Sequence, residues 1–251
     1  MLAAALLLAA THGVLLEDLT WPEAEKRLTP TTVVVIPLGA ESKEHGPHLE
    51  LKNDFLIAEY LKRRVVASAD VVVAPTINYS FYPAFVEYPG STSLRFDTAR
   101  DMVVDICRSL ARFGPRRFYV INTGVSTRRP LAEAAELLRA DGIVMRFTDL
   151  KVTEAVEKTI KKEPAGTHAD EIETSMMLYI APETVDMSKA VRDIHEDHGG
   201  PLTRDPNNHA GTYSPSGVWG DATLATREKG RVVTEALVAA ILREIEELRK
   251  N

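Results

Sequence analysis

Short apolar runs alternate with longer amphipathic segments along most of the chain. The apolar runs are rich in valine and isoleucine, which is typical of strands buried on both faces of a sheet, and they cover residues 32–38, 70–75, 117–122 and 143–148. The amphipathic segments predict helices over residues 20–28, 55–67, 96–113, 131–140 and 223–250. Residues 173–181 fit either a helix or a strand. The alternation predicts an α/β fold with a mostly parallel central sheet.

The alternation starts at Val14 and continues without a low-complexity linker or an internal repeat, so residues 14–251 are predicted to form one domain. Residues 1–13 open with the apolar run MLAAALLLAA, which is as long as the core of a signal peptide and shorter than the roughly 20 residues that cross a bilayer. This segment is interpreted either as the remnant of a signal peptide, in a periplasmic or secreted protein, or as a short N-terminal apolar segment of a cytoplasmic one. No other stretch is predicted to span a membrane.

Composition and charge exclude several classes of function. The net charge of −6 argues against a nucleic-acid partner, because neutralising phosphates needs a basic surface. Cys107 is the single cysteine, so any metal ion must be held by histidines and carboxylates. The sequence has no P-loop, GxGxxG, GxSxG or HExxH motif, which excludes the corresponding nucleotide, dinucleotide, serine-hydrolase and zinc-protease sites.

Candidate chemistry gathers in the loops that follow the predicted strands, where the sites of parallel sheets lie. The loop after Leu38 contains imidazoles and carboxylates, the ligands that suit zinc, manganese or iron(II); they belong to Glu44, His45, His48 and Asp54. The alternative interpretation is an ordinary polar surface loop.

A second polar cluster, THADEIETS at residues 167–175, precedes an apolar segment. If it opens a helix, its acidic residues stabilise the helix N-terminus through the dipole. In the functional interpretation, His168 and Glu173 point into a cleft as ligand, acid or base. A further loop over residues 211–221 is rich in turn formers and carries Tyr213 and Trp219. This loop and the aromatic loop over residues 81–88 could line a pocket, or their rings could simply pack in the core.

Five blocks of sequence resemble the creatininase family, the creatinine amidohydrolases and their relatives. The blocks are LGAESKEHGPHL at residues 38–49, YPGSTSL at 88–94, RRFYVIN at 116–122, THADEIETSMML at 167–178 and WGDATLATREKGR at 219–231. The resemblance covers about residues 15–245. It implies a three-layer α/β/α domain with a dinuclear metal centre, often in a homo-oligomer that is a hexamer, and hydrolysis of C–N bonds in cyclic or linear amides.

The resemblance places the family's metal ligands only in part. His45 and Asp54 keep the spacing of a ligand histidine and of the aspartate that bridges both metals in the family. The family's ligand glutamate falls on Lys43, its second ligand histidine on Gly124, and its second glutamate on Ser126. We therefore expect a divalent metal (Zn, Mn or Fe) as a single ion rather than two, held by His45, Asp54 and a carboxylate from Glu44 or Glu173.

These assignments predict a metal-dependent hydrolase of a non-peptide amide or cyclic amide that acts through metal-activated water. The resemblance implies that His168 protonates the leaving nitrogen and that Glu173 shares the catalytic role, while the pocket for the small-molecule amide includes His48, Asn122 and Ser126. The alternative is a metal-free, inactive, small-molecule-binding relative, because the ammonium of Lys43 would repel a cation.

Overall fold

The computed structural model describes residues 13–196 and 198–250, so the predicted N-terminal segment, apart from Gly13, lies outside the described residues. Within these ranges, the helices are all too short or too polar to cross a membrane. The chain forms strands and helices in alternation from residue 14 to residue 160 and ends in a long helix. The predicted α/β fold is confirmed.

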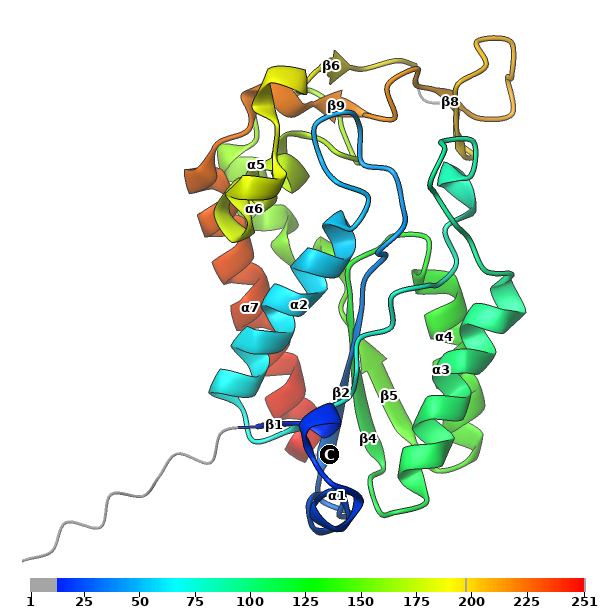
Figure 1. Ribbon diagram of the computed structural model, residues 1–251, viewed down its shortest axis with the longest axis vertical. Coiled ribbons are helices and arrows are strands. Elements are labelled where there is room, and N and C mark those ends of the chain that lie inside the picture. Colours follow the sequence, from blue (N-terminus) through cyan, green and yellow to red (C-terminus); the bar gives the residue numbers. More distant parts are fainter. Residues whose placement is uncertain (1–12, 197, 251) are drawn as a thin grey trace, which may run out of the picture.

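The central sheet has five parallel strands in the order β1-β3-β2-β4-β5 (Figure 1). The strands span Val14–Leu15 (β1), Val33–Leu38 (β2), Val72–Val73 (β3), Arg117–Asn122 (β4) and Val144–Phe147 (β5). Strand β3 is shorter than the apolar run over residues 70–75 that predicted it. β2 and β4 pair along their whole length, with Leu38 opposite Asn122 at the end. The loops that follow these two strands therefore leave the sheet side by side.

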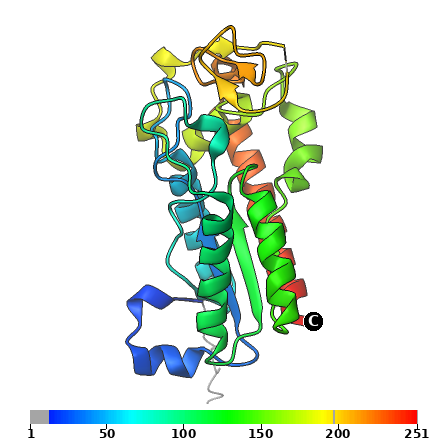
Figure 2. The same cartoon turned by 90° about the vertical axis from the view of Figure 1, so that its right-hand side faces the viewer.

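Helices cover both faces of the sheet and complete three layers (Figures 1 and 2). The helices span Trp21–Arg27 (α1), Asn53–Ser68 (α2), Phe96–Ala111 (α3), Arg128–Ala140 (α4), Glu154–Ile160 (α5), Glu171–Ile180 (α6) and Arg227–Lys250 (α7). Helices α2, α6 and α7 pack on one face, against Val33 and Val35; α3 and α4 pack on the other, against Val34 and Ile36. This alternation explains why the strand consists of apolar residues throughout.

Short 3-10 helices also connect these elements; those in the described part of the chain span Leu16–Asp18, Pro83–Phe85, Leu150–Thr153, Pro182–Thr184, Met187–Lys189 and Ala222–Leu224. The last one replaces the first turn of the helix predicted over residues 223–250. The ambiguous segment at residues 173–181 is helical and forms most of α6. Its N-cap is Asp170, whose Oδ1 accepts the amides of Ile172 and Glu173 at 2.9 Å each, so the acid-rich start of this helix includes a structural cap.

A cap segment, defined here as residues 181–196 and 198–226, crosses the carboxyl edge of the sheet at the top of Figure 1. It contains two small pairs of strands: Arg192–Asp193 (β6) antiparallel to Gly220–Asp221 (β9), and Leu202–Thr203 (β7) parallel to Thr212–Tyr213 (β8). Each strand has two residues, which is too short for a periodic pattern, and the sequence predicted only turns here. The cap segment lies over the edge where the candidate site was expected.

Candidate metal centre

A cavity of about 690 Å³ opens at the carboxyl ends of β2 and β4. Residues from several segments that are far apart in the sequence line it, among them Lys43, Tyr82, Asn122, Gly124, Ser126, His168, Glu173 and Trp219. His45 and Asp54 are fully buried next to this wall. The site therefore lies where the topology of a parallel sheet predicts it.

Hydrogen bonds to oxygen acceptors fix the tautomers of the two site histidines. Nδ1 of His45 lies 2.9 Å from the carbonyl oxygen of Lys43, and Nε2 of His168 lies 2.8 Å from Oε1 of Glu44 and 3.1 Å from its carbonyl oxygen. Because these oxygens only accept, the facing nitrogens carry the protons. The opposite nitrogen of His168, Nδ1, is then a lone-pair donor, and Nε2 of His45 is one whenever that residue is neutral.

Both of these nitrogens face Glu173. Nε2 of His45 is 3.4 Å from Oε1 of Glu173, and Nδ1 of His168 is 3.8 Å from Oε2. Helix α6 starts two residues before Glu173, so its first turn delivers the carboxylate to the cavity wall. Asn53 and the amide of Ala169 donate to the two carboxylate oxygens at 3.1 and 2.7 Å, which hold them in place.

Asp54 connects His45 to Lys43. Its Oδ1 lies 3.0 Å from Nε2 of His45, and its Oδ2 lies 2.8 Å from Nζ of Lys43. Aspartate and lysine are both buried, and the charges of Asp54, Glu173 and Glu44 outweigh the burial and raise the pKa of Lys43. The lysine is therefore a permanent cation beside the cluster.

The donor set fits one divalent cation. Ligand atoms of His45, His168 and Glu173 all lie within 4.8 Å of one another. With neutral histidines, Nε2 of His45 would face two carboxylate oxygens with only lone pairs between them, and this repulsion is relieved by a proton or by a metal ion. The three carboxylates of Glu44, Asp54 and Glu173 exceed the single ammonium by two charges, which one divalent ion neutralises.

The pKa shifts of the cluster follow from the same charges. Burial and Lys43 oppose protonation of His45, but Asp54 and Glu173 outweigh them and raise its pKa to about 9. Burial opposes ionisation of Glu173, yet the charges of His45, His168 and Lys43 lower its pKa and keep it a carboxylate. His48 differs: burial lowers its pKa to about 4. At neutral pH His45 therefore holds a proton, which a metal ion bound to Nε2 would displace.

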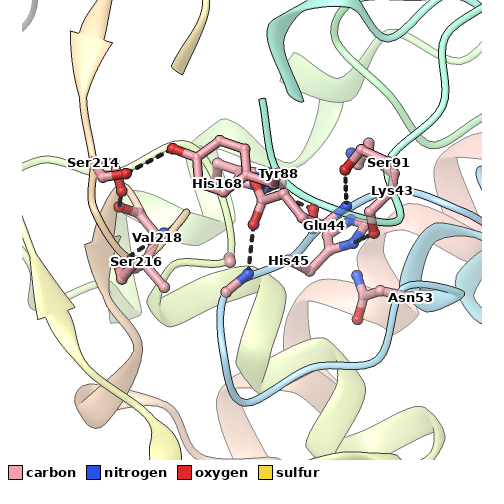
Figure 3. A network of polar contacts seen from close by, with 12 residues as sticks. Lys43, Glu44, His45, Asn53, Tyr88, Ser91, His168, Ser214, Ser216 and Val218 are labelled. Atoms are coloured by element: carbon pink, nitrogen blue, oxygen red, sulfur yellow. Dashed lines mark hydrogen bonds and ion pairs between the residues drawn. The ribbon is translucent and has the colours of Figure 1, made fainter. Parts of the chain in front are cut away.

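Glu44 connects the cluster to the cap segment. Its Oε1 accepts from His168, its Oε2 accepts the amide of Gly46 at 2.8 Å, and its own amide donates to Oγ of Ser91 at 2.9 Å. Figure 3 shows Glu44 between His168 and Ser91. Gly217 of the cap segment approaches so closely that a Cβ there would lie 2.1 Å from Oε2 of Glu44. Its φ of +82° also favours glycine.

The rest of this network joins the loop of residues 81–90 to the cap segment. The hydroxyl of Tyr88 donates to the carbonyl oxygen of Ser214 at 2.7 Å, and Oγ of Ser214 donates to the carbonyl oxygen of Val218 at 2.7 Å (Figure 3). Asp193 accepts from the hydroxyls of Ser214 and Ser216. These bonds fix the part of the cap segment that packs on Glu44.

The structure brings most of the predicted site residues together. His45, Asp54, His168 and Glu173 meet in the cluster, and Asn122 and Ser126 line the cavity. Glu44 contacts His168 rather than the other two expected ligands. His48 is outside the described cavity lining, and its Nε2 lies 2.8 Å from Oγ1 of Thr174.

Aromatic residues from distant segments complete the cavity, and they belong to the two loops, residues 81–88 and 213–219, that the sequence offered as pocket walls. Phe85 and Tyr82 place their rings 4.5 and 5.7 Å from Nζ of Lys43. The hydroxyl of Tyr82 and Nε1 of Trp219 are buried and lack a hydrogen-bond partner within the described part of the chain.

Comparisons with known proteins agree with this fold and site. A family model described as creatinine amidohydrolase matches residues 17–245. A creatinine amidohydrolase from Pseudomonas putida is 29% identical over 94% of this chain and 98% of its own length. A mycofactocin precursor peptide peptidase from Mycolicibacterium smegmatis is 28% identical over 82% of this chain and 81% of its own. A solved structure titled creatininase Mn superposes with a TM-score of 0.76 at 27% identity, covering 94% of this chain and 98% of that one.

Proposed function

The chain belongs to the creatininase family, and we propose that it is a hydrolase of a C–N bond in a non-peptide amide or cyclic amide that uses one divalent cation. A single observation carries the proposal. Nε2 of His45 and Nδ1 of His168 both face the partly exposed carboxylate of Glu173, at the wall of a cavity large enough for a small molecule.

His45, His168 and Glu173 would hold the cation, which is zinc, manganese or iron. Such an ion polarises an amide carbonyl and activates a water molecule for attack. Glu44 holds the proton on Nε2 of His168 and so keeps Nδ1 available as a ligand. The carbonyl oxygen of Lys43 holds a proton on Nδ1 of His45, which leaves Nε2 of that residue to bind the metal. In this assignment His168 is a ligand rather than the proton donor that the family resemblance implies.

The remaining roles fall to residues on the cavity wall. Glu173 is the carboxylate of the cluster that lines the cavity, so it is placed to accept a proton from the attacking water and pass it to the leaving nitrogen. The buried hydroxyl of Tyr82 is a donor without a partner in the described structure, which suits it to the substrate carbonyl oxygen. Asn122 and Ser126 also line the cavity.

The test combines metal content with hydrolysis. Protein purified without chelator is expected to contain about one equivalent of metal by elemental mass spectrometry, and to hydrolyse at least one compound in a panel of creatinine, other cyclic amides, linear amides and short peptides. A chelator should abolish the activity and Mn²⁺ or Zn²⁺ should restore it. His45→Ala should lose the metal and about a thousandfold in kcat/KM, whereas His198→Ala, at an exposed histidine in the cap segment, should lose neither.

A metal-free binding protein is the second candidate, and the ion pair of Lys43 with Asp54 favours it, because this carboxylate is already neutralised without a metal. That protein would contain no metal after soaking in Zn²⁺ and Mn²⁺, would hydrolyse nothing in the panel, and would still bind a small polar molecule. This result would contradict the hydrolase proposal.

A further inference from the structure

Lys43 occupies a position that a metal ion could otherwise take. Its ammonium lies 2.8 Å from Oδ2 of Asp54, while Oδ1 of the same carboxylate lies 3.0 Å from His45, a residue of the metal cluster. The two oxygens of Asp54 therefore face two positions for positive charge, one at the cluster and one taken by the lysine. Lys43 itself is 4% exposed and lines the cavity.

The fold holds the ammonium at this position. The backbone amide of Lys43 donates to the carbonyl oxygen of Leu51 at 3.1 Å, and its own carbonyl accepts from His45. The rings of Phe85 and Tyr82 lie beside Nζ and stabilise its charge. Because the main chain is fixed on one side and the aromatic rings enclose the charge on the other, the side chain has little freedom to swing away from Asp54.

Resting on the proposed function, we propose that the ammonium of Lys43 serves as the second cation of this site: it takes the Oδ2 side of Asp54, so that the centre accepts one divalent ion and no second one. A fixed charge of this kind neutralises Asp54 and repels any further cation from its vicinity. It also keeps a positive charge at the cavity wall when the metal dissociates.

Removing the buried charge of Lys43 is therefore expected to tighten metal binding. In Lys43→Met the repulsion is gone and Asp54 is left without a partner, so both effects favour binding of a cation. The dissociation constant for Mn²⁺ measured by calorimetry is expected to fall by at least about tenfold. Lys43→Glu adds a carboxylate beside Asp54 and is expected to raise the metal content measured by elemental mass spectrometry from about one to about two equivalents.

Two controls separate this role from a structural one. Lys43→Arg keeps the charge and is expected to keep the parental affinity and a single ion. Lys62→Met removes another buried lysine, which lies on α2 and pairs with Glu17 and Glu59. This variant is expected to leave metal binding unchanged. The proposal would be overturned if Lys43→Met bound Mn²⁺ no more tightly than the parent and Lys43→Glu still held a single ion. If neither of these variants folds, tighter Mn²⁺ binding by Lys43→Arg would overturn it.

Failure of the proposed function gives a different result. Parent protein without bound metal contradicts the hydrolase assignment by itself. In that case, metal binding by Lys43→Met alone would still support the assignment of Lys43 as a resident cation, and the absence of metal from both proteins would contradict it.

Discussion

Two buried ionic clusters flank the start of α6, and they differ in what neutralises their carboxylates. In the metal centre, Glu173 faces ring nitrogens of two histidines. In the second cluster, Glu171 pairs with Lys229 and accepts the amides of Lys162 and Glu163 at 2.8 and 2.7 Å. Glu171 and Glu173 lie on the same helical turn, yet the charge of Glu171 is paired with a lysine, whereas Glu173 faces two histidines.

The second cluster continues around Lys161. Its ammonium contacts Glu163 at 2.9 Å, Asp170 at 3.3 Å and the carbonyl oxygen of Gly166 at 3.0 Å. Lysine and backbone amides are hydrogen-bond donors that cannot bind a metal ion, and they occupy the carboxylate oxygens of this cluster. The comparison teaches that a count of acidic residues does not identify a site; the identity of their partners does.

The largest effect on stability is expected at the saturated cluster. Lys229→Met leaves the fully buried Glu171 without its cation, which should lower the free energy of unfolding by about 3–5 kcal/mol in urea denaturation. The metal content of the folded fraction should stay at the parental value. A decrease in the free energy of unfolding below about 1 kcal/mol, or a loss of bound metal, would contradict the view that the Lys229 cluster serves stability alone.

An intermediate effect is expected where the metal centre meets the cap segment. Glu44→Gln replaces the ionised acceptor of His168 by an amide and should weaken metal binding by about 10–100-fold, with little change in unfolding. The matched control is Glu41→Gln, an exposed glutamate in the same loop, which should leave the affinity unchanged. Equal affinities of the Glu44 variant and the parent for the metal ion, measured by calorimetry, would show that Glu44 has only a structural role.

The smallest effect concerns pH. Burial and the charge of Asp170 raise the pKa of Glu163 from 4.5 to about 7. The folded state therefore holds a proton that the unfolded chain has lost between these values, and stability falls as pH rises through this window. Glu163→Gln should reduce that decline by about 1 kcal/mol, allowing for solvent screening, in unfolding curves at pH 5 and pH 8. An identical decline in parent and variant would show that other groups produce it.

The sequence predicted most of the sheet and its helices because most of these elements are long enough to show a pattern; the two-residue strand β1 and the helix α5 were not predicted. The strand at residues 117–122 was predicted with both ends correct, since a strand buried on both faces of a sheet is mostly apolar. The strands of the cap segment have two residues each, and such lengths leave no periodicity to detect.

The candidate site could be predicted as a set of residue types but not as an arrangement. His45, Asp54, His168 and Glu173 were identified from their chemistry and from the family resemblance. Their tautomers depend on a backbone carbonyl and on Glu44, 124 residues before His168. The enclosure of Lys43 by Tyr82 and Phe85 likewise depends on a loop with no motif of its own.

The distance along the chain between the cluster residues has a consequence for the abundance of the protein. His45 follows β2, whereas His168 and Glu173 belong to the start of α6, more than 120 positions later. An ion that binds only the folded chain cross-links these segments and adds RT ln(1 + [M]/Kd) to the free energy of unfolding, about 2.7 kcal/mol at one hundred times Kd. Metal starvation would then increase the unfolded fraction that proteases degrade, and the metal supply would set how much protein a cell retains as well as how much of it is loaded.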